Sequence, residues 1–133
     1  MPASRTIYVI APPKTVVSTE YSICAFTHHV RMIPLMLKDR GWTIVELSNG
    51  TSQSTADEHG QVLSLDELKN TVDHKIDGLF YGRVAEILKT RTADNTMILH
   101  TYGYSHHVAK EVKGWHVESH VGYGQTPGSY FRI

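Results

Sequence analysis

"EYSICAFTHHVRMIPLMLKDRGWTIVEL", residues 20–47, decides the fold because it joins a helix directly to a strand. Apolar residues recur at helical intervals in it, which predicts an amphipathic helix of about four turns over residues 24–40. These apolar residues are Phe26, Val30, Ile33 and Leu37. Gly41 stands where a helix C-terminus favours a left-handed residue. A strand over residues 42–48 follows at once.

The residues before this helix predict a first strand. Residues 6–11 contain an almost unbroken apolar run, which is typical of a strand buried on both faces of a parallel sheet. Pro12 and Pro13 end the run. The two strands and the helix between them form a unit in which the strands should be parallel.

Strands and helices continue to alternate downstream. Residues 49–61, "NGTSQSTADEHGQ", predict a mobile surface loop, and "SLDE" from Ser64 to Glu67 matches a capping box at a helix start. The remaining predicted elements are helices over residues 65–72, 80–90 and 104–114 and strands over residues 95–103 and 115–124. This alternation predicts an α/β fold with a Rossmann-like open, mainly parallel sheet of about four or more strands flanked by helices.

The composition limits the class of protein. A length of 133 residues suits a single Rossmann-like domain, residues 1–133. The 13 basic and 13 acidic residues cancel, so we expect no general nucleic-acid binding. Cys24 is the only cysteine, which excludes a disulfide scaffold. No apolar run approaches the ~18 residues of a membrane span and no signal peptide is evident, so we expect a cytoplasmic protein.

The end of the sequence raises a separate expectation. Residues 125–133, "QTPGSYFRI", finish on aromatic and aliphatic residues without a closing helix. This suggests a chain cut inside a larger protein or a domain that needs a partner surface; the alternative is an ordinary ragged terminus.

Candidate binding residues follow the predicted strands. Ligands of open parallel sheets bind beyond the carboxyl ends of the strands. About ten residues separate the first strand from its helix, where a tight turn needs about 2 to 6, so residues 14–22 can form one wall of a cleft. Hydrogen-bonding groups there come from Thr15, Ser18, Thr19, Glu20 and Ser22, and a flat apolar face from Tyr21. The alternative is an ordinary surface loop.

Two further turns lie at the same predicted edge. In "TYGYSHH", Gly103 permits a sharp turn and Ser105 can cap the next helix, whose free amides favour an anionic or hydroxyl-rich ligand. In "HVGYGQTPG", Gly122 and Gly124 give only G-x-G, so the dinucleotide fingerprint is not met. This second turn is a flexible connection or, alternatively, a phosphate cradle.

The nine histidines do not form a metal motif. Those at 28–29 and 106–107 are neighbours on helices and point apart, while His116 and His120 stand about 13 Å apart on a strand. We therefore expect no metal site. His116, Glu118 and His120 share a polar face that should meet a solvent cleft or a sheet edge, where a histidine can act as a base; the alternative is a wet edge strand without chemistry.

Most of the chain resembles the N-terminal domain of GT-B glycosyltransferases, particularly a group of viral and bacterial members. The resemblance is carried by "EYSICAFTHHVRMIPLMLKDRGWTIVELSNG", "DEHGQVLSLDE" and "TMILHTYGYSHHVAKEVKGWHVESHVGYGQTPGSYFRI". It implies one half of a GT-B fold, the acceptor side of a transferase that moves a sugar from a nucleotide-sugar donor to an acceptor hydroxyl. No tightly bound cofactor is implied, because the nucleotide sugar is the donor substrate of the full enzyme.

The resemblance also implies partners and site residues. A C-terminal donor-binding domain, on the same or a separate chain, must complete the enzyme, so the 133 residues are not expected to be active alone. A sugar or glycan is the implied acceptor. Residues 18–27 and the two glycine turns match cleft-lining regions, and His120 or His106 is the candidate base. The cleft-lining residues are Ser18, Thr19, Glu20, Tyr21, Ser22, Thr27, Tyr102, Gly103, Ser105, Gly122, Tyr123 and Gly124.

The sequence departs from the resemblance in one place and leaves alternatives open. The glycine pair that many relatives carry in the first loop is replaced here by "PPKTVVSTEYS". A stand-alone sugar- or nucleotide-binding module without catalysis keeps the same sheet and cleft. The missing glycine fingerprint argues against an oxidoreductase, and the absence of an acidic cluster after the first strand argues against a response regulator.

Overall fold

The computed structural model describes residues 5–17, 25–37, 40–102, 106–119 and 131–132, with side chains in these ranges except at 25–29, 106–107, 119 and 131–132. The strands are β1 (Thr6–Ile10), β2 (Thr43–Ser48), β3 (Glu58–Gln61), β4 (Met97–His100), β5 (Trp115–Ser119) and β6 (Phe131–Arg132). The helices are α1 (Ala25–Leu37), α2 (Leu65–Asn70), α3 (Asp73–Leu88) and α4 (His106–Glu111).

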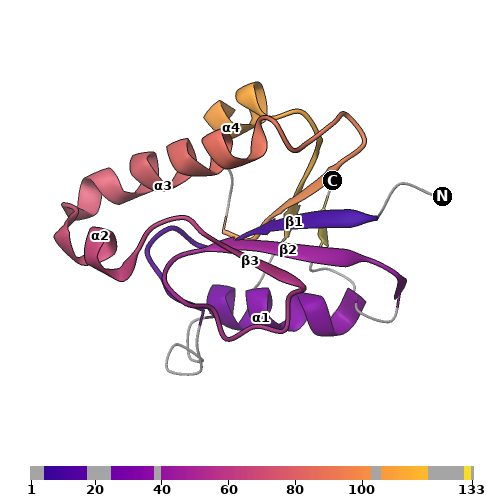
Figure 1. Ribbon diagram of the computed structural model, residues 1–133, viewed down its shortest axis with the longest axis horizontal. Coiled ribbons are helices and arrows are strands. Elements are labelled where there is room, and N and C mark those ends of the chain that lie inside the picture. The colour runs from indigo at the N-terminus through magenta and orange to yellow at the C-terminus, as the bar shows by residue number, and fades with distance from the viewer. Residues whose placement is uncertain (1–4, 18–24, 38–39, 103–105, 120–130, 133) are drawn as a thin grey trace.

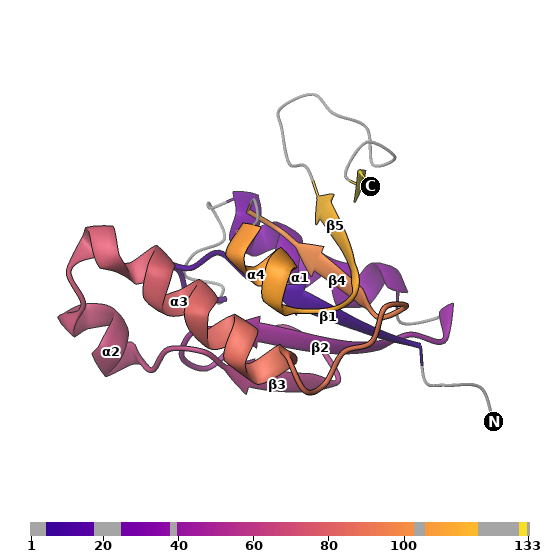
Figure 2. The same cartoon turned by 90° about the horizontal axis from the view of Figure 1, so that it is seen from above.

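The six strands found in the described residues form one sheet in the order β3-β2-β1-β4-β5-β6. The first five are parallel, and β6 pairs antiparallel with β5. Helix α1 covers one face of the sheet, while α3 and α4 cover the other, as Figures 1 and 2 show. The predicted Rossmann-like α/β fold, with an open and mainly parallel sheet, is therefore confirmed.

The core lies in two layers on either side of the central strand β1. Ile7 and Val9 pack toward α1 with Ile33, whereas Ile10 packs toward α3 with Phe80. All five side chains are at most 3% exposed. Burying an apolar side chain of this size stabilises the fold by about 1.5–3 kcal/mol. The apolar run in β1 is buried on both faces, as the sequence predicts.

Two local predictions are confirmed in detail. The Ser64 hydroxyl accepts a hydrogen bond from the Glu67 backbone N–H at 3.1 Å, and the Glu67 carboxylate accepts one from the Ser64 backbone N–H at 3.0 Å. This capping box starts α2. Gly41 has a φ of 80°, the left-handed conformation expected after α1.

Two other predictions are wrong. The segment 49–61 is not a loop throughout, because Glu58–Gln61 form β3 and pair in parallel register with Val45–Ser48 of β2. Three of the four β3 residues are exposed, so this edge strand lacks the apolar run that marks β1. The helix predicted over residues 80–90 begins at Asp73, with Gly78 and Gly82 inside it.

Among the described residues, every helix is too short or too polar to span a lipid bilayer.

Candidate functional site

The strand order creates a switch point between β1 and β4. The chain leaves β1 toward α1 on one face and leaves β4 toward α4 on the opposite face (Figure 1). The two connections diverge beyond the carboxyl ends of adjacent strands, which is where open α/β sheets bind ligands. We call this region the switch-point crevice; its described rim consists of residues 11–17 after β1 and residues 101–102 after β4.

The start of the first loop is fixed to the end of β2 by Asn49. The Asn49 side-chain amide, which is fully buried, donates to the carbonyl oxygen of Pro13 at 2.7 Å and to that of Thr15 at 3.2 Å. Its side-chain oxygen accepts from the Leu63 backbone N–H at 3.2 Å. Val16 forms an isolated parallel bridge with Asn49. Residues 13–16 therefore run along the carboxyl edge, on the side of the sheet predicted for the ligand.

The rim on β4 is fixed to β1 by Thr101. Its backbone N–H and its buried hydroxyl both donate to the carbonyl oxygen of Ile10, at 3.3 Å and 2.8 Å. Tyr102, the next residue, has 53% of its surface exposed. The described rim thus consists of two backbone segments held by hydrogen bonds, and it carries the exposed aromatic ring of Tyr102.

Helix α3 supplies a third side of the rim. Lys14 forms an ion pair of 3.0 Å with Asp73 in the first turn of α3, and this hydrogen bond raises the pKa of Lys14. Burial raises the pKa of Tyr81 to about 12, with the charges of Asp77 and Tyr102 contributing. Tyr81 therefore stays protonated and remains a hydrogen-bond donor at neutral pH. The cation of Lys14, the carboxylates of Asp73 and Asp77 and the phenols of Tyr81 and Tyr102 thus interact with one another near the carboxyl edge of the sheet.

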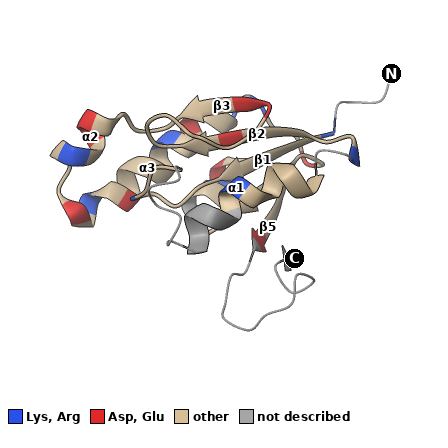
Figure 3. Cartoon of the chain, turned by 90° about the horizontal axis from the view of Figure 1, so that it is seen from below, with Lys and Arg blue, Asp and Glu red and all other residues tan. Residues whose placement is uncertain are grey.

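The sequence did not identify Lys14, Asp73, Asp77 or Tyr81 as site residues. Asp73, Asp77 and Tyr81 are spaced four residues apart, which places them on one face of a helix. That signal was missed because the helix was predicted to begin at Phe80. Figure 3 shows that the α2 and α3 starts carry charges of both signs.

Few of the predicted site residues can be placed. The side chains of Thr15 and Tyr102 are described: the Thr15 hydroxyl donates to the carbonyl oxygen of Pro12 at 3.4 Å, and Tyr102 is exposed just after β4. Thr27 lies in the first turn of α1 and His106 begins α4, with only their backbones described. The others lie outside the described residues: Ser18, Thr19, Glu20, Tyr21, Ser22, Gly103, Ser105, His120, Gly122, Tyr123 and Gly124.

The His116 side chain, on the predicted polar face of β5, is half-buried and has two close polar contacts. Its Nε2 lies 2.9 Å from the Val112 carbonyl oxygen and its Nδ1 lies 2.9 Å from Nε2 of His100. Because a carbonyl only accepts, His116 Nε2–H donates to Val112 and His100 Nε2–H donates to His116. His100 is fully buried at the end of β4, and burial, with the charge of His116, lowers its pKa to about 3.

A second polar network lies under the connection from β2 to β3. The buried carboxylate of Glu46 accepts from the Ser48 hydroxyl at 2.7 Å and from the Ser54 hydroxyl, which also lies 3.1 Å from Nε2 of His59. Beside it is a cavity of about 220 Å³. Its lining residues are Ser48, Gly50, Thr51, Ser52, His59, Gly60 and Gln61. Because hydroxyl donors compensate the buried carboxylate, the network holds residues 52–54 over the edge of the sheet.

Among the described residues there is no group of three or more His, Cys, Asp or Glu side chains arranged to hold a metal ion.

No family model matches the sequence, and neither the curated proteins nor the solved structures include a match to the chain.

Proposed function

We propose that the chain is the acceptor-side, Rossmann-like domain of a GT-B glycosyltransferase. The observation that carries this proposal is the switch point between β1 and β4, with the first loop anchored along its edge by Asn49. An acceptor domain requires a crevice at this edge, facing a donor domain. The motif resemblance covers the same strands and loops.

The described rim offers groups suited to a hydroxyl-rich ligand. Lys14 and Asp73 supply a charged donor and acceptor, and Tyr81 supplies a protonated phenol. Charge-assisted hydrogen bonds to sugar hydroxyls are stronger than neutral ones. The exposed ring of Tyr102 can stack on the apolar face of a pyranose. Together these groups favour a sugar or glycan acceptor.

In the proposed reaction, a base removes the proton of the acceptor hydroxyl, the oxygen attacks the anomeric carbon, and the nucleoside diphosphate leaves. His106 and His120 remain the proposed candidates for the base. The nucleotide sugar is held by a C-terminal donor-binding domain on the same or a separate chain. The 133-residue chain therefore binds acceptor but does not turn over donor.

Calorimetry on the 133-residue chain tests this proposal. Simple glycans should bind with Kd in the millimolar range, about −4 kcal/mol, and Tyr102→Ala should weaken this binding at least about fivefold. Trp115→Ala is the matched control, because Trp115 is an exposed aromatic at the opposite edge, 45% exposed at the start of β5. Nucleotide sugars should not be hydrolysed.

Two results would contradict the proposal. Loss of affinity with Trp115→Ala but not with Tyr102→Ala would place glycan binding elsewhere. Tight saturation by a nucleotide sugar that Tyr102→Ala abolishes, without any partner, would support a stand-alone binding module instead.

A further inference from the structure

A second pocket lies at the amino edge of the sheet, the opposite edge from the switch-point crevice. It has a volume of about 420 Å³ and is formed by the start of β1, by residues just before β1, β2 and β4, and by Arg91, which follows α3. Its lining residues are Arg5, Thr6, Tyr8, Trp42, Arg91, Ala93, Asn95 and Thr96. This volume lies within the range of about 300–1,000 Å³ that is usual for small-molecule sites. We call it the amino-edge pocket.

Two arginines on aromatic rings define its chemistry. The guanidinium carbon of Arg5 lies 5.8 Å from the centroid of the Trp42 ring, and that of Arg91 lies 5.3 Å from the centroid of the Tyr8 ring. A guanidinium over an aromatic face is attracted by the ring and is held in a defined orientation. A guanidinium carries five N–H donors in its plane, and Arg91 uses part of this set to donate to Glu58 at 3.0 Å.

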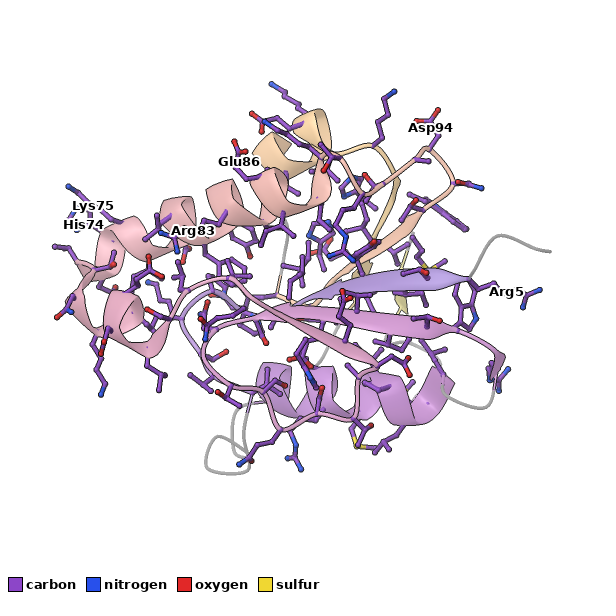
Figure 4. The ribbon with its side chains drawn as sticks, viewed as in Figure 1. Arg5, His74, Lys75, Arg83, Glu86 and Asp94 are labelled. Carbon is purple, nitrogen blue, oxygen red and sulfur yellow. The ribbon has the colours of Figure 1, made fainter. Side chains whose placement is uncertain are left out.

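The charges around the pocket favour an anion. Arg91 is paired with Glu58 at 3.0 Å, whereas Arg5 has no ion pair with any described residue. Asp94 lies between the lining residues Ala93 and Asn95 in sequence but does not itself line the pocket. In Figure 4 its carboxylate points away from the protein. The lining residues thus include two cations and no carboxylate, and Glu58, outside the lining, pairs with one of the two.

We propose that the amino-edge pocket binds a small organic phosphate monoester. Arginine matches phosphate oxygens with paired N–H donors, and two guanidiniums suit the three terminal oxygens of a monoester better than the two of a carboxylate. Thr6, Asn95 and Thr96 add polar groups, and Trp42 adds an apolar wall for the organic part. This inference is independent of the proposed acceptor site, because no residue of the switch-point crevice lines the pocket.

Titration of the isotope-labelled chain, followed by amide NMR shifts, tests the proposal. Glucose 6-phosphate should shift the amides of Thr6, Asn95 and Thr96 with saturation. Glucose and glucuronate, the latter carrying a carboxylate at the same position, should bind at least fivefold more weakly. A parallel titration with AMP shows whether the pocket prefers a nucleotide or a sugar phosphate. A titration with inorganic phosphate measures how much of the affinity comes from the phosphate group alone.

Two variants complete the experiment. Arg5→Gln should weaken the binding of glucose 6-phosphate at least fivefold, while Lys75→Gln should leave it unchanged. Lys75 is an exposed lysine at the opposite end of the molecule (Figure 4), so its loss removes the same charge without touching the pocket. A thermal melt of each variant reports that it is folded.

The proposal is overturned if neither phosphate ester binds, if glucuronate binds as well as glucose 6-phosphate, or if both variants weaken binding equally. Shifts confined to the switch-point crevice would also overturn it. Because glycan binding is tested at Tyr102 and phosphate binding at Arg5, failure of one proposal is distinguishable from failure of the other.

Discussion

The side-chain amide of Asn49 donates a hydrogen bond of 2.7 Å to the carbonyl oxygen of Pro13, thirty-six residues earlier in the chain. This bond joins the end of β2 to the loop that follows β1. It explains how residues 13–16 keep a fixed path along the carboxyl edge.

Replacing Asn49 by alanine should reduce stability. The substitution leaves the carbonyl of Pro13 and the amide of Leu63 without this partner inside the fold, and buried unsatisfied groups cost about 1–3 kcal/mol each. We expect a loss of roughly 2–4 kcal/mol in the free energy of unfolding by urea. Asn70→Ala, at the exposed end of α2, should change it by less than about 0.5 kcal/mol. Equal stability of the two variants would contradict the role of Asn49.

Lys14→Gln should separate binding from stability. The pair with Asp73 is solvent-exposed, so the urea midpoint should not change measurably. Glycan binding should weaken about three- to tenfold if the ammonium group donates to a sugar hydroxyl. Lys69→Gln, on the exposed surface of α2, is the control of equal charge. Unchanged affinity in Lys14→Gln would remove this lysine from the acceptor site.

His100 should make stability depend on pH. Its pKa is near 6.5 in the unfolded chain and about 3 in the folded chain, so the unfolded state binds more protons between these values. Stability due to this group is therefore complete above pH 6.5 and declines as the pH falls toward 3. Between pH 7 and pH 5 the expected loss is about 2 kcal/mol.

Urea unfolding of His100→Gln at both pH values measures this contribution. The variant should lose less stability than the parent chain over this range, whereas His74→Gln, on the exposed start of α3, should follow the parent. The hydrogen bond from Arg83 lowers the pKa of the Glu67 carboxyl to about 2. This group therefore changes the free energy of unfolding with pH only below about pH 4.5. An identical pH dependence in the parent and His100→Gln would show that the buried imidazole does not control it.

Two glycines should respond to alanine in opposite directions. Gly114, between α4 and β5, has a φ of 153°, and a Cβ there would stand 2.6 Å from Ile98 Cδ1 and 2.9 Å from the Thr96 carbonyl oxygen. Gly114→Ala should therefore destabilise the fold by about 1–3 kcal/mol. Gly78→Ala, inside α3 with open space around it, should stabilise it by about 0.5–1 kcal/mol. Thermal melts that moved both variants in the same direction would contradict this account.

The sequence predicts the fold where apolar periodicity is strong. The run in β1, the helical spacing in α1 and the capping box at Ser64 all correspond to elements of the structure. Strand β3 was missed because its side chains are mostly exposed and its pairing is a backbone property. The early start of α3 was missed because its first turns carry mainly polar residues, with Ile76 buried among them.

The site was less predictable than the fold. Topology alone locates the carboxyl edge, and the role of Tyr102 at that edge stays a prediction. Asn49, by contrast, looks like an ordinary turn residue in "SNGTS", and only the fold brings it against Pro13. The contact between His100 and His116 depends on the pairing of β4 with β5, and the local sequence around either histidine does not reveal this pairing.

The most direct test of the central claim is a map of amide NMR shifts during titration of the chain with simple glycans. We expect the largest changes along the switch-point crevice, at Ala11, Lys14, Asn49 and Tyr102, with the start of β5 unaffected. Changes confined to the amino edge of the sheet, or none at glycan concentrations well above the millimolar range, would contradict the assignment of this crevice as a sugar-acceptor site.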